Sequence, residues 1–399
     1  MAEISPFCAL YYSPEKVKDI SLVVTPPYDV ISPEERLKFY IRHPLNVIRL
    51  ILPNSPLEAR ETLKQWLSQG VFEREHHEAI YPYRQVFSYE GRKLKRWGFI
   101  CLLKLDTIIR EHEHTFEEVV RERLELLEHT GIQTGEVFSL YSDPKGEIEA
   151  LLSKVEALEP RFSFKDEEGV EHTLWAVYDQ EEISKIKGKL SDQELFLADG
   201  HHRLKTARLL RERRLASGKN RGLEDYILAY LTGMEYEGLV ILPVHRLLKG
   251  LDGTRLEALR KNLMENFSCQ ETSKEAIPTI LMEGKGMVFW EKDRNPLMIR
   301  PKRDLPYPFG RIDPWVIDEL VLKGLQGEVS YVKEMDEALK ALEDGVAQAV
   351  FLLRAVNPRE VAEVAKRGLL MPKKSTYFYP KVPTGLVFFQ VFELDGDNP

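Results

Sequence analysis

The sequence predicts an α+β protein with mixed sheets, hairpins and flanking helices. Segments of strand type and helix type alternate along the chain, which is typical of sheets covered by helices. Several neighbouring strands are separated only by short turns that contain glycine, which indicates antiparallel hairpins among them. We expect two lobes around one cleft, one of residues 1–190 and one of residues 191–399, or a single intertwined domain.

The elements of the first half follow from apolar periodicity, caps and turns. Ser32 fits the N-cap of a first helix because Pro33 follows it. Thr115 and Glu118 fit a capping box for a helix that ends at about Gly131. The other expected elements are a strand over 46–53, a helix over 57–70, a hairpin over 81–105 with its turn at Glu90 and Gly91, a strand over 135–143, a helix over 146–158, a hairpin over 161–179 turning near Gly169, and a helix over 181–190.

The second half continues this alternation. Residues 195–198 form a short apolar strand, and Leu204, Ala207 and Leu210 then recur at helical spacing. The other expected elements are strands over 225–234 and 238–248, a helix over 252–267, strands over 279–292 and 295–302, helices over 313–325 and 335–345, a strand over 347–355, a helix over 357–368 between Asn357 and Gly368, and a loop and strand over 371–394.

Composition restricts the classes of function. The chain has 399 residues, of which 43% are hydrophobic, and this is enough for two or three domains with real cores. A net charge of -8 argues against general nucleic-acid binding. No apolar run is long enough for a membrane span, and the N-terminus lacks the pattern of a signal peptide, so we expect a cytoplasmic protein. Three widely spaced cysteines offer neither a disulfide framework nor a CxxC metal site.

A polar cluster, Asp199-Gly200-His201-His202-Arg203, lies where the apolar strand meets the next helix. Gly200 permits a tight turn, and Asp199 can cap the helix that follows. The two histidines and Arg203 then occupy the first turn, where backbone N–H groups lack partners and the helix dipole is positive. These features favour an anion, and phosphate suits the guanidinium of Arg203.

Three further segments are polar where packing would favour other residues. His112 and His114 alternate around Glu113 ahead of a helix, so in an extended chain they share one face. His245 and Arg246 end a buried strand. The segment 371–381, MPKKSTYFYPK, combines lysines, hydroxyls and aromatic rings in a loop, which is typical of a grip on an anion. The chain has no GxxxxGK[ST], no GxGxxG after a strand and no protein-kinase signature, so any nucleotide is held in a less common way.

The order of the segments PPYDVIS, HEHT, RERLELL, ADGHHR, GLVILPVHR and MPKKSTYFYPK, along about residues 10 to 390, resembles a bacterial and archaeal family with a domain of unknown function. The DGHHR box alone is similar to that of the ParB/sulfiredoxin-like free serine kinases, where it begins a helix and holds nucleotide phosphates. This resemblance implies a ParB/sulfiredoxin-like element around the box. His114, where the family often has another residue type, and Lys373, where a neutral residue often stands, are departures that remove no expected ligand.

The resemblance implies a kinase that uses ATP or ADP with Mg²⁺ to phosphorylate a small metabolite, most plausibly free L-serine to O-phosphoserine. Such a reaction needs a phosphate cradle, cations and a carboxylate that orients the hydroxyl. Glu113 is the preferred general base and Asp29 the reserve, while Asp199 can cap, hold magnesium or act as base. The remaining expected roles are catalysis for His112, phosphate or nucleotide binding for Gly200, His201, His202, Arg203, His245 and Arg246, and substrate binding for Asp29, Lys374, Ser375, Thr376 and Lys381.

Two alternatives come from other classes of protein. The first is a metal-dependent hydrolase in which His112, His114, His201, His202 and His245 supply ligands. Against it, Arg203 follows the histidine pair and would repel a cation, and HEHT lacks the spacing of HExxH. The second is a non-catalytic nucleotide-binding module, which would bind a nucleotide tightly without turnover.

Overall fold

The computed structural model describes residues 2–219, 222–325 and 327–393, which form two compact units. Unit 1 contains the described residues of 2–111, 115–239 and 380–393, and unit 2 contains those of 112–114 and 240–379. The chain therefore leaves unit 1 twice and returns to it twice. The two units differ from the two lobes expected on either side of residue 190, because segments from both sides of that residue belong to unit 1.

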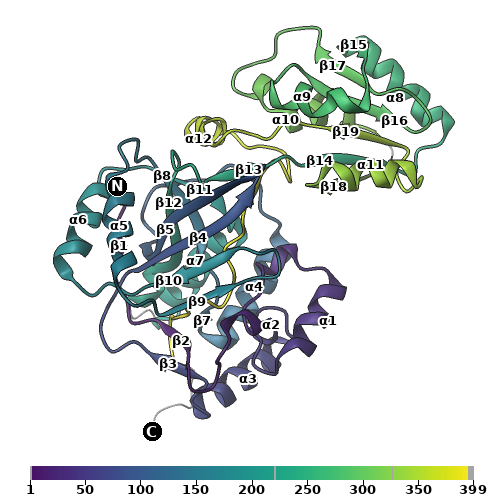
Figure 1. Ribbon diagram of the computed structural model, residues 1–399. Helices are drawn as coiled ribbons and strands as arrows, with labels where there is room; N and C mark the ends of the chain where they lie inside the picture. The colour runs from purple at the N-terminus through teal and green to yellow at the C-terminus, as the bar shows by residue number, and fades with distance from the viewer. Residues whose placement is uncertain (1, 220–221, 326, 394–399) are drawn as a thin grey trace. The chain divides into compact units, whose positions relative to one another are not determined.

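Unit 1 is built on one mixed sheet (Figure 1). Its described strands are β1 (Ile4–Ser5), β4 (Tyr81–Tyr89), β5 (Arg92–Lys104), β6 (Ile109–Arg110), β8 (Val137–Tyr141), β9 (Phe162–Lys165), β10 (Glu171–Leu174), β11 (Leu195–Asp199) and β12 (Tyr226–Gly233). Their order is β6-β11-β8-β12-β5-β4-β10-β9, and β1 also pairs with β5. The pairs β6–β11 and β8–β12 are parallel and the others are antiparallel, so the mixed α+β class is confirmed.

Both predicted hairpins of this sheet are present. The β4–β5 turn places Glu90 at φ 49° and Gly91 at φ 73°, and positive φ at both central residues is what a two-residue type I′ turn requires. The β9–β10 hairpin turns at Gly169, which also has positive φ. The short connections fix the register of these strands, which places alternate side chains of β5 in the core.

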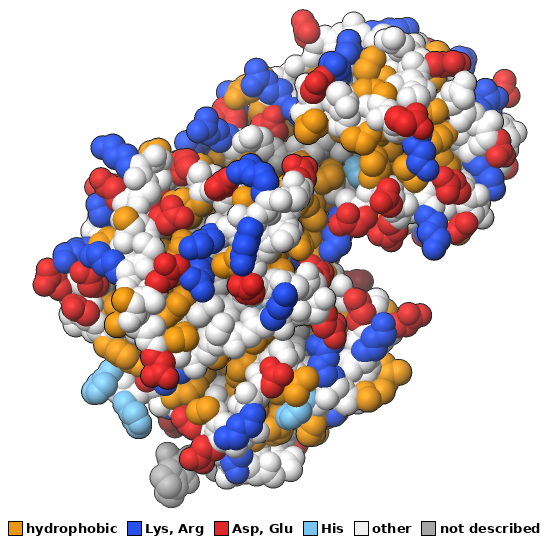
Figure 2. All heavy atoms as spheres, viewed as in Figure 1, with side chains coloured by type: hydrophobic (Ala, Val, Ile, Leu, Met, Phe, Trp, Pro, Cys, Tyr) orange, Lys and Arg blue, Asp and Glu red, His pale blue; other side chains and the backbone are white. Residues whose placement is uncertain are grey.

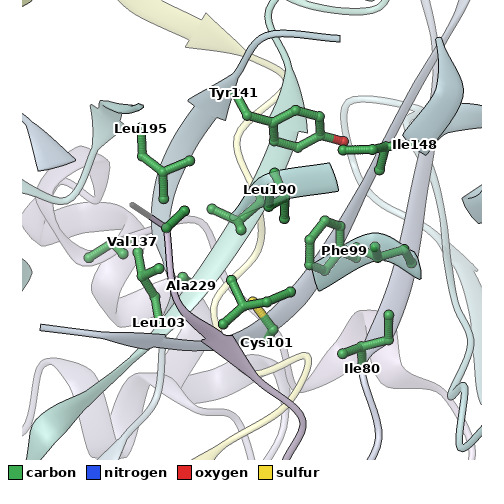
Figure 3. Packing of buried hydrophobic residues seen from close by; sticks show 14 of the residues in the cluster. Ile80, Phe99, Cys101, Leu103, Val137, Tyr141, Ile148, Leu190, Leu195 and Ala229 are labelled. Atoms are coloured by element: carbon green, nitrogen blue, oxygen red, sulfur yellow. The ribbon is translucent and has the colours of Figure 1, made fainter. Parts of the chain in front are cut away.

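The main core of unit 1 lies between this sheet and the helices α5 (Glu147–Ser153), α6 (Gln180–Leu190) and α7 (His201–Ala216). Phe99, Cys101 and Leu103 alternate along β5 and point into it, where they meet Leu190 of α6 and other apolar side chains (Figure 3). Burial of each large apolar side chain contributes about 1.5–3 kcal/mol, so this cluster holds the sheet and the beginning of α7 in place.

The other helices of unit 1 are η1 (Ile20–Leu22), η2 (Tyr28–Val30), α1 (Pro33–Arg42), α2 (Ile48–Ile51), α3 (Pro56–Ser68), α4 (Glu117–Thr130), η3 (Lys154–Ala157) and η4 (Leu223–Asp225), and its short strand pairs are β2 (Leu10–Tyr12) with β3 (Phe72–Arg74) and β7 (Ile132–Gln133) with β21 (Phe389–Gln390). A second core lies among α1, α2, α3, the β2–β3 pair and Ile132 of β7. Ser32 caps α1 in a full capping box with Glu35, so this predicted start is confirmed.

Two local predictions in unit 1 are wrong. Residues 46–53, expected as a strand, contain the short helix α2, because the Asn46 side chain accepts the N–H of Ile48 and starts a turn. The Thr115–Glu118 capping box does not form, since α4 begins after Phe116, whose N–H donates to Nε2 of His202 at 3.0 Å. The predicted end of α4 at Gly131 is confirmed, with φ 64° at that residue.

Unit 2 contains an antiparallel sheet of order β15-β17-β16-β19-β14-β18 and a separate pair of strands, β13 with β20. The strands are β13 (Val240–Leu242), β14 (His245–Lys249), β15 (Phe267–Glu271), β16 (Met287–Glu291), β17 (Leu297–Pro301), β18 (Glu328–Val332), β19 (Ala349–Leu352) and β20 (Tyr377–Tyr379). The helices are α8 (Gly253–Asn266), η5 (Lys274–Ala276), α9 (Ile277–Met282), η6 (Phe309–Arg311), α10 (Asp313–Ile317), the π-helix η7 (Asp318–Leu322), α11 (Met335–Glu343) and α12 (Pro358–Lys366).

The unit 2 sheet carries a hydrophobic cluster on each face, one under α8 and α10 and one under α9 and α11. Residues 279–282, expected at the start of a strand, belong to α9, because Ile277 and Ile280 recur at helical spacing and are buried together. The predicted helix after Asn357 is confirmed with a full capping box.

The distribution of charged side chains and the polarity of the helices agree with the mixed charges of the sequence and its lack of long apolar runs. On the face shown in Figure 2, basic and acidic side chains are interspersed over both units. None of the described helices is both long and apolar enough to cross a membrane.

Candidate anion-binding site

The junction of β11 and α7 has a backbone shape that only glycine adopts easily. Gly200 lies at φ +93° and is the N-cap of α7, which starts at His201. A Cβ atom at this position would lie 3.1 Å from Nε of Arg203 and 3.2 Å from Cα of Val137. The glycine therefore permits both the turn and the close approach of β8 and Arg203.

Asp199 does not cap α7, contrary to the expectation from sequence. Its Oδ1 accepts the N–H of Gly200 at 2.7 Å, and the N-cap of α7 has no side-chain hydrogen bond. The first-turn N–H groups of a helix have no partners within the helix, and α7 carries no acidic residue in this turn. The positive end of α7 is thus free of a competing carboxylate from its own first turn.

Asp199 instead holds two cations. Nζ of Lys381 donates to its Oδ2 at 2.7 Å, and Nη2 of Arg203 lies 3.7 Å from its Oδ1. Burial alone would raise the pKa of Asp199, but the charges of Lys381 and Arg203 hold the pKa of that carboxyl well below its usual range. Asp199 is therefore ionised at neutral pH and a poor proton acceptor, which favours ion binding over general-base chemistry.

Two buried side chains fix the backbone of Lys381. Nε2 of Gln85 donates to the Lys381 carbonyl at 2.9 Å, and Nη2 of Arg96 donates to the Pro380 carbonyl. Nε of Arg96 also donates to Oε1 of Gln85 at 3.0 Å, so the two side chains form one clamp. The clamp holds Lys381 at the point where the chain re-enters unit 1, from which its ammonium group reaches Asp199.

Glu136 lies next to the same cluster in a buried position. Its backbone carbonyl accepts from Nη1 of Arg203, and its side chain is 3% exposed. Burial raises the pKa of Glu136 to about 7, and the charge of Arg203 only partly opposes this. Among the described residues, no group hydrogen-bonds its Oε1. The carboxyl therefore changes charge near neutral pH beside the Arg203 anchor.

A pocket opens beside Arg203, between α4 and α7, and is called the α4–α7 pocket below. It is partly open to solvent. Its walls include the aliphatic side chains of Leu50, Leu126, Leu127, Ile132, Ala207 and Ile227. Its polar lining includes Tyr28, Arg123, Thr130, Gln133, Arg203 and Thr206. Both charged side chains that line the pocket are arginines, so it favours an anionic ligand with an apolar body.

Tyr28 connects this pocket to the charged cluster. The guanidinium of Arg123 lies 4.5 Å from the centre of its ring. Burial raises the pKa of Tyr28 to about 12. The charges of Arg203 and Arg123 lower this pKa, and those of Asp29 and Asp199 raise it. The reserve base Asp29 follows Tyr28 in η2 with an exposed side chain, so the structure brings it into the electrostatic environment of this site.

The two histidines of the DGHHR box differ in their surroundings. His201 is buried with 5% exposure. His202 accepts the Phe116 N–H through Nε2, and its ring stacks on that of Phe116 at 5.8 Å. This nitrogen supports the N-terminus of α4 and does not remain available for phosphate.

The other expected site residues lie in unit 2, where backbone and side-chain hydrogen bonds connect three of the motifs. The His112 carbonyl accepts the N–H of Met371 at 2.8 Å, and Nη1 of Arg246 donates to the Lys374 carbonyl at 3.0 Å. His112 is buried, Glu113 is partly buried, and Lys374 is exposed with φ 52°. Unit 2 thus gathers the HEHT, PVHR and MPKK motifs.

Several of these side chains already serve the fold of unit 2. Burial lowers the pKa of His245 to about 4, and its Nδ1 accepts the N–H of Leu353 at 3.1 Å, so it lacks the charge that a phosphate ligand would gain from. Arg246 is fully buried and pairs with Asp318 at 3.3 Å. The hydroxyl of Ser375 donates to the Pro372 carbonyl at 2.7 Å, while Thr376 next to it is partly buried.

The metal-dependent hydrolase alternative gains no support. Within residues 2–219, 222–325 and 327–393, no three His, Cys, Asp or Glu side chains are grouped so as to hold a metal ion. The five histidines also divide between the units, since His201 and His202 lie in unit 1 and the other three in unit 2.

Sequence reasoning missed several residues of the site. Arg123 falls on the buried stripe of α4 with Val120, Leu124 and Leu127, and a cation at helical spacing within an apolar stripe is a readable signal. Arg96 stands among the basic residues at the start of β5, which gives no sign that it is buried. Glu136 and Thr206 carry no such mark in the sequence.

Comparisons with known proteins give one family and several similar structures. The profile of a family described as "Protein of unknown function (DUF1015)" matches residues 4–313. No curated protein matches the chain. Similar solved structures include a conserved hypothetical protein from Pyrococcus furiosus, which is 16% identical to this chain and has a TM-score of 0.39. The match covers 73% of this chain and 95% of the Pyrococcus chain. A variant of free serine kinase in complex with AMP has 15% identity and a TM-score of 0.40 over 72% of this chain and 92% of that one. SbnI from Staphylococcus aureus, truncated at its C-terminus, has 12% identity and a TM-score of 0.40 over 71% of this chain and 85% of that one.

Proposed function

Starting from a chain that belongs to the DUF1015 family, we propose that it is a small-molecule kinase that transfers a phosphoryl group from ATP or ADP to a metabolite hydroxyl. The observation that carries the proposal is the cluster of Asp199, Lys381 and Arg203 at the N-terminus of α7, beside the α4–α7 pocket. Phosphoryl transfer requires little more from a protein than positioning and electrostatic stabilisation. The DGHHR resemblance suggests free L-serine as the acceptor.

The first turn of α7 is proposed to hold the phosphates. The N–H groups of His201 to Arg203 and the guanidinium of Arg203 offer charge-assisted hydrogen bonds, and Lys381 adds a second cation. Mg²⁺ bound with the nucleotide would neutralise phosphate charge, and Asp199, as an ionised carboxylate, is the residue that suits it. The Lys381–Asp199 pair then keeps both charges next to the phosphates.

The chemical step forms one bond and breaks one. The acceptor oxygen bonds to the terminal phosphorus, the bond from that phosphorus to the bridging oxygen breaks, and the shortened nucleotide leaves with the bridging oxygen. The hydroxyl proton goes to a carboxylate. We assign it to Glu113, with Asp29 in reserve, because the low pKa of Asp199 makes it a weak acceptor. His112, Lys374 and Thr376 remain proposed ligands of the substrate or the nucleotide, whereas His245, Arg246 and Ser375 are buried and bonded within unit 2.

The test is direct detection of the product. The full chain is incubated with ATP or ADP, magnesium and a panel of hydroxyl amino acids, and phosphorylated products are identified by mass spectrometry. We expect O-phosphoserine together with the nucleotide shortened by one phosphate. Tight nucleotide binding with no product from any acceptor would contradict the kinase and favour the non-catalytic binding module.

A pair of variants separates the carboxylate roles. Glu113→Gln should reduce kcat about 10²- to 10⁴-fold with nucleotide affinity nearly kept, since it removes a base and keeps size. Asp199→Asn should weaken nucleotide binding as well, because it releases Lys381 and Arg203. A Glu113→Gln enzyme with full turnover would remove Glu113 from the mechanism, and the role would pass to Asp29 or Asp199.

A further inference from the structure

We propose that the α4–α7 pocket binds the base and sugar of the nucleotide whose phosphates lie at the first turn of α7, an inference that rests on the proposed function. Arg203 connects the two places, because it belongs to the first turn of α7 and also lines the pocket. Thr206 and Ala207, one turn further along α7, continue the same wall. A ligand anchored by phosphate at this turn can therefore extend along α7 into the pocket.

The lining of the pocket fits a nucleoside. Ligand pockets typically have apolar walls with a few polar groups, and this pocket has that composition. Leu126 and Leu127 of α4 and Ile227 of β12 supply flat aliphatic surface, which suits the faces of an aromatic base.

Two buried polar atoms in the pocket lining have no partner within the described part of the chain. These atoms are Nε of Arg123 and the hydroxyl oxygen of Thr206, and the two residues are 9% and 3% exposed. A buried donor without a partner costs about 1–3 kcal/mol, so natural chains rarely keep one without a use. A bound adenine offers acceptors at its ring nitrogens that would satisfy both.

Other polar groups of the lining are already used by the fold. The Thr130 hydroxyl donates to the Leu126 carbonyl at 2.8 Å within α4. Oε1 of Gln133 accepts the N–H of Leu228 at 2.7 Å, and its Nε2 donates to the Tyr226 carbonyl. Arg123 and Thr206 are therefore the residues to which we assign recognition of the base, through their unpartnered buried donor atoms.

The experiment compares ADP with inorganic pyrophosphate, which has phosphates and no nucleoside. Binding of each to the full chain is measured by calorimetry for the wild type, Thr206→Val, Thr173→Val and Arg203→Ala. Thr206→Val should weaken ADP binding roughly 2- to 12-fold, the value of one hydrogen bond, and leave pyrophosphate binding unchanged. Thr173→Val makes the same chemical change in β10, outside the pocket lining, at a hydroxyl that pairs with Ser163, so it should alter neither affinity. Arg203→Ala should weaken both ligands.

The unliganded Thr206→Val chain should melt at or above the wild-type temperature, because valine replaces a buried hydroxyl that lacks a partner. Ala207→Phe is a second probe that fills the pocket, and it should reduce ADP affinity more than pyrophosphate affinity. Two results would overturn this inference and leave the proposed function standing. In the first, the pocket variants bind ADP and pyrophosphate more weakly to the same degree. In the second, both pocket variants keep the ADP affinity of the wild type while Arg203→Ala loses it. A wild-type chain that binds neither ADP nor ATP would instead overturn the proposed function.

Discussion

Arg203 connects three parts of unit 1. Its Nη1 donates to the Glu136 carbonyl, its Nη2 faces Asp199, and its stem lines the α4–α7 pocket. Arginine keeps its charge at every accessible pH, so it remains an anion ligand whatever the state of its neighbours. The fold thus holds the guanidinium of Arg203 between the Glu136 carbonyl and the Asp199 carboxylate.

Removing this side chain should remove the anchor for phosphate. Arg203→Ala should weaken nucleotide binding by about 1.5–3 kcal/mol, the range of hydrogen bonds to charged groups. Arg213→Ala serves as the control, because Arg213 lies on the same helix and pairs with Glu128 at 3.0 Å on an exposed surface. Calorimetric titration with ADP measures both, and equal affinity of the Arg203→Ala chain and the wild type would refute the phosphate site.

Glu136 should make the stability of unit 1 depend on pH. Its folded pKa of about 7 lies above the ordinary value of 4.5, so between these values the native state keeps a proton that the unfolded chain releases. The free energy of unfolding therefore falls as pH rises through this window, by about 3 kcal/mol in total at 1.4 kcal/mol per unit, and this contribution is constant above about pH 7.

Glu136→Gln removes this dependence, because the amide stays neutral in both states. We expect the free energy of unfolding of the variant to fall less than that of the wild type between pH 5 and pH 7. Hydrogen exchange of the β8 amides, which lie directly after Glu136, reports the opening of unit 1 in both chains. Parallel pH profiles for the two chains would show that Glu136 has no raised pKa.

At the scale of elements, the β11–α7 connection depends on the positive φ of Gly200 and on its lack of a Cβ atom. Gly200→Ala should destabilise unit 1 by about 1–3 kcal/mol and weaken nucleotide binding, because its Cβ meets Arg203 and Val137 at 3.1 and 3.2 Å. Gly218→Ala separates the two causes: Gly218 also has positive φ, at 68°, but open space around it. We expect a loss of about 1 kcal/mol there and normal affinity, measured by thermal unfolding and ADP titration. Equal effects of the two substitutions would mean that crowding at Gly200 is unimportant.

Elements with strong local signals could be predicted from the sequence. The Glu90-Gly91 turn, the Ser32 cap and the Asn357 cap all appear, because each depends on residues within a few positions of one another. The wrong predictions arise where a tertiary contact sets the structure or where the spacing of apolar residues fits both a helix and a strand. The apolar run at 46–53 fits a helix or a strand equally, and the start of α4 is set by His202, which lies 86 residues away.

The candidate site shows the same division. Asp199, Gly200 and Arg203 stand out because a polar cluster interrupts an apolar strand-to-helix junction. The Lys381–Asp199 pair joins residues 182 positions apart, and no local pattern reveals such a partner. Arg123 and Thr206 line the same pocket only because α4 packs on α7, and this contact is not visible in the sequence.

At the scale of the whole molecule, the boundary expected at residue 190 ignores sheet pairing. β11 and β12, which follow that residue, lie in one sheet with β4 and β5, which precede it. The composition offers no linker there because the two units exchange segments along the chain, at 111/112, 114/115, 239/240 and 379/380. A sequence pattern that reports local structure cannot show which distant strand is the neighbour.

Nucleotide binding should stabilise unit 1 in particular. ADP at about 100 times its Kd should add about 2.7 kcal/mol to the free energy of unfolding of the unit that binds it. Hydrogen exchange with and without ADP should therefore slow in α4, β8 and α7, with pyrophosphate protecting the first turn of α7 alone. Protection confined to residues 240–379 would place the nucleotide in unit 2 and contradict the assignment.

The return of the chain to unit 1 after Tyr379 has a consequence for the order of biosynthesis. The segment 380–391 supplies Lys381, the Thr384 bridge to Thr25 and the β21 partner of β7. The ribosome makes this segment only after residues 240–379, so unit 1 lacks Lys381 and β21 throughout the synthesis of unit 2. The Lys381–Asp199 pair of the proposed phosphate site therefore forms only after that synthesis, and a chain stalled before residue 380 should not hold nucleotide phosphates in the normal way.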